Sequence, residues 1–189
     1  CGTGQPSLNL SKLQPVKCPG EAVPTELEVS CHQYPMGNGY LAVAVLHAKE
    51  PVDDPVLVVH GGPGGRAVAD RHYWLAPRSH ILARSDMILV DQRGGGWSKP
   101  SLDCTELDDP AVNLHDAYRT CHNRLTAEGV DFAQYQVSDI AADLVALRND
   151  LEVPRWNLYA VSFGTRVALA LLQTDAEAVT SAVLDSPMP

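Results

Sequence analysis

A serine stands between an apolar strand and an apolar helix in residues 156–166, and this junction limits the folds available to the chain. The motif G-x-S-x-G is nearly matched by Ala160-Val161-Ser162-Phe163-Gly164, with alanine in the first glycine position. In that motif a strand turns sharply into a helix, which lifts the serine hydroxyl above the end of the sheet. The backbone N–H of the next residue then points to where an oxyanion would form. We therefore predict that Ser162 is a nucleophile.

Further strands are predicted by apolar runs that end in turns, over residues 56–60, 87–91, 157–161 and 182–185. Residues 27–48 alternate and predict an antiparallel hairpin, with its turn over residues 34–39. Helices are expected over residues 71–84, 138–152 and 163–173. Strands that alternate with helices in this way indicate an α/β fold, a mostly parallel sheet with helices on both faces.

A long excursion is expected over residues 99–135, and it contains apolar residues at helical spacing that place Cys121 on a buried face: Leu114, Tyr118, Cys121 and Leu125. Ser138 is the expected N-cap of the following helix, whose apolar stripe consists of Ile140, Leu144, Leu147 and Leu151. Residues 1–24 are expected to form a tether and an irregular lead-in, and residues 25–189 the folded domain.

The charge of the chain bears on its partners. Its formal net charge is -9 and its pI about 5.1. Phosphate binding needs a basic face, so nucleic acid is not an expected partner. No apolar run approaches the ~18 residues of a membrane-spanning helix. We expect no metal and no cofactor, because the chain has neither a C-x-x-C pair nor an H-x-x-x-H helix and its glycines do not follow G-x-G-x-x-G.

The chain contains five cysteines, so one is left over when the others pair. We expect Cys1 to be the unpaired cysteine, because it precedes a small, polar tether and resembles the lipid-carrying cysteine of a processed bacterial lipoprotein. The alternative is that the sequence merely starts at a cysteine. Pairing by proximity joins Cys18 to Cys31 and Cys104 to Cys121, with four free thiols as the alternative. Disulfides predict an extracytoplasmic protein, either a cell-envelope lipoprotein or a secreted one.

Three segments follow expected strands and should meet at one edge of the sheet, where sites of α/β proteins lie. They are residues 61–65, residues 91–98 and Ser162. We expect the amides of Gly62 and Phe163 to form an oxyanion hole there. Glycine lets the backbone approach a substrate closely, and Phe163 opens a helix whose dipole faces the site. A tight turn or a phosphate cradle is the alternative role of the glycine loop.

Five charged or titratable residues near these segments have two interpretations each. We expect His60 to be a hydrogen-bonded core residue rather than a base. Asp185 is either a displaced triad acid or a structural residue at a strand end. Asp139 and Asp143 are expected on a solvated or capping face, not as a carboxylate pair. Arg93 is expected to brace its loop, with direct substrate contact as the alternative.

Four segments occur in the order HGGPGG (residues 60–65), DQRGGGWS (91–98), AVSFGT (160–165) and LDSP (184–187). Together they resemble the prolyl aminopeptidases of the α/β-hydrolase family, in particular the secreted tripeptidyl-aminopeptidase-like branch. The Cys104/Cys121 pair also resembles that branch. The resemblance implies that Ser162 is the nucleophile and that Gly62 and Phe163 supply the oxyanion-hole amides. It further implies a peptide substrate cleaved near its free N-terminus, or a related small amide or ester.

Members of this family are longer and continue with a helical cap, a catalytic Asp and a catalytic His. The last histidine of this chain is His122. We therefore expect an α/β-hydrolase domain truncated after the strand that follows the elbow, with no triad Asp or His and little turnover alone. The alternatives to an aminopeptidase-like serine hydrolase are an inactive hydrolase-like lipoprotein or binding module, and an esterase or lipase. An unpaired last strand also predicts a complementary C-terminal half or an oligomer as partner.

Overall fold

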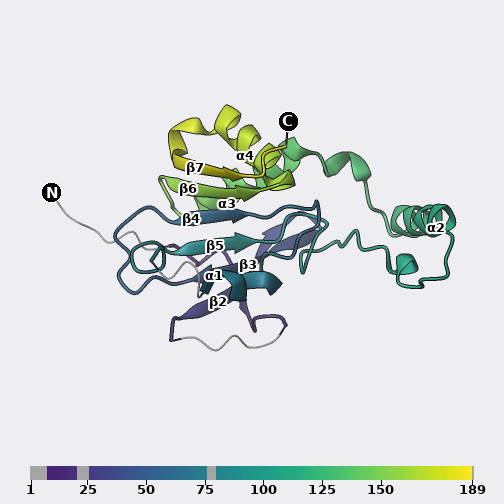
Figure 1. Cartoon of the computed structure of the whole chain (residues 1–189), viewed down its shortest axis with the longest axis horizontal. Helices are drawn as coiled ribbons and strands as arrows, with labels where there is room; N and C mark the ends of the chain where they lie inside the picture. The colour runs from purple at the N-terminus through teal and green to yellow at the C-terminus, as the bar shows by residue number, and fades with distance from the viewer. Residues whose placement is uncertain (1–7, 21–25, 76–79, 189) are drawn as a thin grey trace.

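The computed structural model describes residues 8–20, 26–75 and 80–188. Cys1, with its expected lipid anchor and tether, lies outside these residues. In the described part of the chain, one seven-stranded sheet has the strand order β1-β2-β3-β5-β4-β6-β7 (Figure 1). The strands are β1 (Gln14–Val16), β2 (Val29–Met36), β3 (Gly39–Leu46), β4 (Val56–Val59), β5 (Met87–Val90), β6 (Trp156–Val161) and β7 (Val179–Asp185).

The sheet divides into an antiparallel half, β1 to β3, and a parallel half formed by β5, β4, β6 and β7. β4 and β5 consist entirely of apolar residues, as expected of strands that are covered on both faces. Helices α3 (Val137–Asp150) and α4 (Phe163–Thr174) contribute to the core on one face, and α1 (His72–Leu75) lies on the other. The expected α/β fold is confirmed.

The lead-in was expected to be irregular, but its described part, residues 8–20, packs against the domain. Leu13 is 4% exposed, and β1 pairs with β2 at the sheet edge. The Asn9 N–H donates to the Leu151 carbonyl oxygen at 2.9 Å, and the Lys12 ammonium lies 2.5 Å from the Asp150 carboxylate. Because these contacts are made with distant residues, the local sequence held no sign of them.

The hairpin differs from expectation at its turn. β2 continues to Met36, so residues 34–36 belong to the strand and Gly37 and Asn38 make the connection. Pro35 is compatible with this strand because β1 pairs only with residues 31–33, which leaves β2 as the sheet edge beyond Gln33. A proline is tolerated at such an edge, where its missing N–H faces no partner strand.

The apolar stripe expected on α3 is confirmed, but the helix boundaries differ from expectation at two places. Ile140, Leu144, Leu147 and Leu151 are all buried, as expected. The N-cap of α3 is Gln136 rather than Ser138, and the Gln136 N–H donates to the Asp139 carboxylate at 2.9 Å. Of the helix expected over residues 71–84, residues 76–79 lie outside the described part of the chain, and the described residues contain α1 (His72–Leu75) and turns at 80–84. There the carbonyls of Leu82 and Arg84 bind backbone N–H groups of residues 49–53 instead of a helix of their own.

The excursion between β5 and α3 projects from the body of the domain (Figure 1). It contains α2 (Leu114–Ala127), and the described part of the chain also has four short 3₁₀ helices: η1 (Ala69–Arg71), η2 (Thr105–Leu107), η3 (Phe132–Gln134) and η4 (Ala176–Ala178). Cys121 and Leu125 are buried as predicted, but Leu114 and Tyr118 are 64% and 57% exposed, because α2 packs mainly on η2 rather than on the sheet.

Both expected disulfides are present, Cys18–Cys31 and Cys104–Cys121. Cys18–Cys31 ties the lead-in to β2, and Cys104–Cys121 ties η2 to α2 within the excursion. Among the described helices, none has both the length and the apolar character needed to span a bilayer.

Candidate active site

Ser162 occupies a strained turn between β6 and α4. Its φ is 51° and its ψ is -122°, a backbone conformation that a non-glycine residue adopts only when the surrounding structure imposes it. Two glycines make the turn possible. A Cβ at Gly164 would lie 2.1 Å from the Val59 carbonyl oxygen, and a Cβ at Gly61 would lie 3.0 Å from the Ser162 Cβ. The turn therefore presses directly against the end of β4.

The segments that were expected to meet do so at the carboxyl ends of β5, β4 and β6. The loop after β4 touches the loop after β5, where a Cβ at Gly95 would lie 2.8 Å from the Gly64 Cα. The same loop touches the elbow through Gly61. The Ser162 N–H donates to the Asp185 carbonyl oxygen at 2.9 Å, which adds the end of β7 to the cluster.

The two amides expected to form an oxyanion hole adjoin the contact between Gly61 and Ser162, because Gly62 follows the one residue and Phe163 the other. Gly62 is exposed and has a φ of 126°, and its peptide bond to Pro63 is cis. Phe163 is the first residue of α4, where backbone N–H groups have no carbonyl partner within the helix. Both donors thus stand at the end of the sheet beside Ser162, an arrangement compatible with the binding of an oxyanion.

Asp91 holds the two loops together, a role that the sequence reasoning did not assign. Its fully buried carboxylate accepts from the Val68 N–H at 2.9 Å and from the Trp97 N–H at 2.8 Å. Burial raises the pKa of Asp91 to about 6, although these two hydrogen bonds act in the opposite direction. An aspartate at the end of an apolar strand was a usable signal, because a buried carboxylate requires donors.

The three consecutive glycines after Arg93 each face a different neighbour. A Cβ at Gly94 would lie 2.8 Å from the Leu102 side chain and 3.0 Å from the Tyr135 ring, and one at Gly96 would lie 2.2 Å from the Asp91 carboxylate. Gly95 faces the glycine loop. A side chain at any of these three positions would push the loop after β5 away from the neighbour that the glycine faces.

His60 does not lie in the core, which corrects the expectation for this residue. Its side chain is 32% exposed, its Nδ1 lies 3.3 Å from the Gly61 carbonyl oxygen, and its Nε2 lies 3.8 Å from the Asp70 carboxylate. The ring packs under the glycine loop, where a Cβ at Gly65 would lie 2.0 Å from Nδ1. The His60 carbonyl accepts from the Gln92 side chain at 2.8 Å. These contacts favour a role in supporting the loop.

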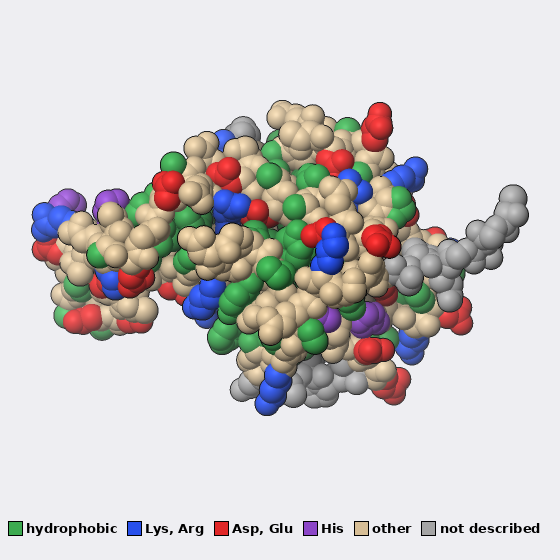
Figure 2. Space-filling view, turned by 180° about the vertical axis from the view of Figure 1, so that it is seen from behind, with side chains coloured by type: hydrophobic (Ala, Val, Ile, Leu, Met, Phe, Trp, Pro, Cys, Tyr) green, Lys and Arg blue, Asp and Glu red, His purple; other side chains and the backbone are tan. Residues whose placement is uncertain are grey.

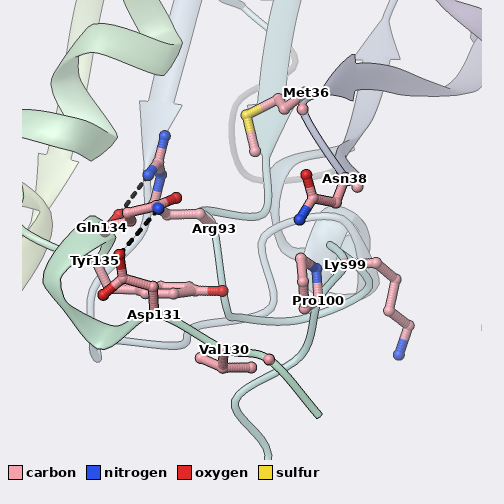
Figure 3. A pocket seen from close by; sticks show the side chains of 12 residues that line it. Met36, Asn38, Arg93, Lys99, Pro100, Val130, Asp131, Gln134 and Tyr135 are labelled. Carbon is pink, nitrogen blue, oxygen red and sulfur yellow. Dashed lines mark hydrogen bonds between the residues drawn. The ribbon is translucent and has the colours of Figure 1, made fainter. Parts of the chain in front are cut away.

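Arg93 braces its loop, as expected. Its guanidinium forms a bidentate ion pair with Asp143 at 2.6 and 2.7 Å. It also donates to the Gln134 carbonyl oxygen (Figure 3). Asp143 was expected on a solvated or capping face, but its side chain is only 11% exposed. Burial raises the pKa of Asp143, whereas Arg93 acts to lower it. Asp139 does have the expected capping role at the start of α3.

The Ser162 hydroxyl is paired with a residue that sequence reasoning missed. Its Oγ lies 3.8 Å from the Met188 Sδ, and the Met188 N–H donates to the Thr165 hydroxyl at 2.9 Å. In the described part of the chain this thioether, rather than a histidine, is the hydrogen-bond partner of the serine hydroxyl. Asp185 accepts from the Tyr159 hydroxyl at 3.2 Å and from Ser186, contacts that suit a structural residue at a strand end.

Three potential metal-binding groups gather in the excursion: Cys104, Cys121 and Glu106 lie with their ligand atoms within 4.8 Å of one another. The two sulfur atoms form the disulfide, and Glu106 forms an ion pair with Arg124 at 2.8 Å. The disulfide and the ion pair account for this cluster without a metal.

A strand-to-helix turn that carries a half-buried serine, next to a glycine loop at the end of the neighbouring strand, is the arrangement typical of α/β hydrolases. Residues 54–189 match the family model described as the alpha/beta hydrolase fold. The chain therefore belongs to the α/β-hydrolase family.

Among curated relatives, the chain is 30% identical over 156 residues to the proline iminopeptidase of Xylella fastidiosa, covering 79% of this chain and 39% of that protein. It is 27% identical over 156 residues to the proline iminopeptidase of Arabidopsis thaliana, covering 79% of this chain and 32% of that protein. The crystal structure of a proline iminopeptidase-related protein from Thermus thermophilus aligns with a TM-score of 0.55 and 27% identity over 85% of this chain and 44% of that one. The chain thus spans about a third to two fifths of the curated relatives' length.

Proposed function

We propose that the protein is a serine hydrolase that acts through an acyl-enzyme on Ser162. The observation that carries this proposal is the strained elbow, which presents Ser162 between the Phe163 amide and the glycine loop. The hydroxyl would attack a carbonyl carbon, and the oxygen of the resulting tetrahedral intermediate would accept from the amides of Gly62 and Phe163. Loss of one such donor typically costs about 10²–10³ in rate.

A serine needs a histidine base and a group that orients the base. We propose that both come from polypeptide that corresponds to the rest of the relatives' length, so the 189-residue chain alone would show little turnover. The similarity to proline iminopeptidases supports a peptide substrate cleaved next to its free N-terminus, with small amides or esters as related substrates. The motif alone is equally compatible with an esterase, so the choice of substrate rests on this similarity.

The experiment that tests the nucleophile is covalent labelling of the full-length protein with a fluorophosphonate, followed by mass spectrometry of the digested protein. We expect one adduct, on the peptide that contains Ser162, and none in a Ser162→Ala variant. A Ser186→Ala variant serves as the matched control, because Ser186 follows the end of β7 near the elbow and is exposed. An adduct on another residue, or no adduct at all, would contradict the proposal.

We also propose an extracytoplasmic location, which the two disulfides support. The predicted lipid anchor at Cys1 is a separate proposal, since that residue lies outside the described part of the chain. Intact-mass measurement of the protein purified from its natural host, before and after reduction, would distinguish the disulfides from a lipid modification.

The outer edge of the sheet predicts a partner. β7 is paired only on the side of β6 among the described residues, and Val183 on β7 and Leu169 on α4 are 53% and 40% exposed. An unpaired strand with exposed apolar side chains tends to pair with further polypeptide. We propose that a complementary C-terminal segment, or a second copy of the chain, covers this edge.

We therefore expect the isolated 189-residue chain to self-associate as its concentration is raised, and a Val183→Lys variant to do so less. Sedimentation velocity measures both. Val52→Lys is the matched control, because Val52 is 47% exposed in the connection before β4. A wild-type chain that stays monomeric throughout, or equal effects of the two substitutions, would contradict the proposal.

A further inference from the structure

A cavity of about 610 Å³ opens beside the proposed oxyanion hole. Pro63 and Gly64 of the glycine loop line it, and so does Phe163, the residue that follows the proposed nucleophile. The cavity therefore lies next to the elbow, between the residue that follows Ser162 and the glycine loop. Its volume falls within the range of pockets that hold small-molecule ligands.

The other walls come from the excursion and the start of α3, and most of their side chains are apolar. Leu102, Leu107, Tyr135, Val137 and Ile140 line this part of the cavity. Figure 2 shows hydrophobic side chains where the projecting lobe joins the body of the domain. A ligand group that enters here would exchange water for apolar contacts.

The charged residues of the lining leave little free charge inside. Arg93 is held by Asp143 in a bidentate ion pair and also donates to the Gln134 carbonyl oxygen, so its guanidinium is already paired. Asp103 is exposed. A charged ligand group in the cavity would lose its hydration without a matching partner, which is unfavourable.

The excursion wall is held in place by several independent links. The Cys104–Cys121 disulfide joins η2 to α2, and Arg124 binds both Glu106 and the Asp103 carbonyl oxygen. On the other side, the Leu102 N–H donates to the Gly94 carbonyl oxygen at 2.9 Å. The cavity is therefore bounded by fixed elements rather than by a free loop.

We propose that this cavity binds an apolar side chain of the substrate, of leucine or phenylalanine size, next to the bond that Ser162 attacks. The proposal rests on the proposed function and adds a preference for the substrate residue. Burial of such a side chain favours binding by on the order of 10- to 100-fold relative to an exposed one. The enzyme would therefore favour peptides with a large apolar residue beside the scissile bond over those with alanine or lysine.

Direct binding to the full-length protein tests the cavity without any need for catalysis. The probes are the N-acetyl amides of phenylalanine, alanine and lysine, and the readout is the NMR shift of the Val137 and Ile140 methyl groups. We expect saturable shifts with the phenylalanine amide, and at least about tenfold weaker binding of the other two. A Leu107→Trp variant, which fills the cavity, should abolish the shifts. Leu114→Trp, on the same excursion but 64% exposed in the wild type, should not.

A labelling experiment connects the cavity to Ser162. The phenylalanine amide should slow fluorophosphonate labelling of the wild type and of Leu114→Trp, but not of Leu107→Trp. If the wild type is not labelled even without ligand, the proposed function fails. If it is labelled but the amides bind equally, or if Leu107→Trp responds like the wild type, the nucleophile stands and the apolar side-chain pocket is overturned.

Discussion

A Gly164→Ala variant is expected to be less stable than the wild-type chain by about 3 kcal/mol, although alanine is the better helix former. A Cβ at this position would lie 2.1 Å from the Val59 carbonyl oxygen and 2.8 Å from that of His60. Both oxygens belong to the backbone at the end of β4, so neither can rotate away as a side chain would. The clash is relieved only if α4 moves off the sheet, and Ser162 moves with it.

Urea-induced unfolding followed by circular dichroism measures this effect. The control is Gly129→Ala, since Gly129 has a φ of 87° but nothing within 4 Å of its Cβ position, and there we expect a cost of only about 1–2 kcal/mol. Labelling of Ser162 should slow in Gly164→Ala and stay unchanged in Gly129→Ala. Helix propensity alone predicts that Gly164→Ala gains about 1 kcal/mol. A variant as stable as the wild type would therefore show that the close contact is absent.

The elements with a strong local pattern were predictable. β4 and β5 are short apolar runs between turn residues, and the stripe of α3 repeats with helical spacing over four residues that are all buried. The elbow was predictable for a different reason. The small residues on either side of the serine, Ala160 and Gly164, satisfy a steric requirement of the backbone, which the sequence shows directly.

Elements that depend on distant partners were not predictable. β1 exists because β2 offers an edge, and residues 80–84 bind the backbone before β4 instead of continuing a helix. Leu114 and Tyr118 follow helical spacing but face solvent, because α2 projects from the domain. Periodicity shows that a helix has an apolar face, but it does not show whether the rest of the fold reaches that face.

In the candidate site, too, the features set by the local sequence were predictable and those set by distant residues were not. The positions of Ser162, Gly62 and Phe163 at one sheet edge were predicted because each lies just after an expected strand, whereas the environments of His60 and Asp143 were not predicted. His60 is partly exposed because its ring lies under a surface loop, and Asp143 is buried because Arg93 crosses from another strand end to reach it. Burial of a polar side chain depends on a partner that is remote in the sequence.

The stability difference between the wild type and an Asp91→Asn variant is expected to change with pH because Asp91 titrates and asparagine does not. Burial raises the pKa of Asp91 from its ordinary 3.8 to about 6 in the folded chain. The folded state then binds this proton more tightly than the unfolded state does. The stability that Asp91 contributes is therefore complete below about pH 4 and is lost as the pH rises through about 6, by on the order of 3 kcal/mol in total.

Denaturant unfolding of both proteins at a series of pH values from about 4 to about 7 measures this difference. The asparagine side chain of the variant retains one acceptor oxygen for the two N–H donors of Val68 and Trp97, so one buried N–H loses its partner. That loss adds a cost of about 1–3 kcal/mol that does not vary with pH. The change of this stability difference with pH therefore measures the effect of burying the Asp91 carboxyl. The part of the difference that does not change with pH measures the loss of its hydrogen bonds. A difference that rises with pH would show instead that the two N–H donors outweigh burial and hold Asp91 ionised, as a permanent anion between the two loops of the site.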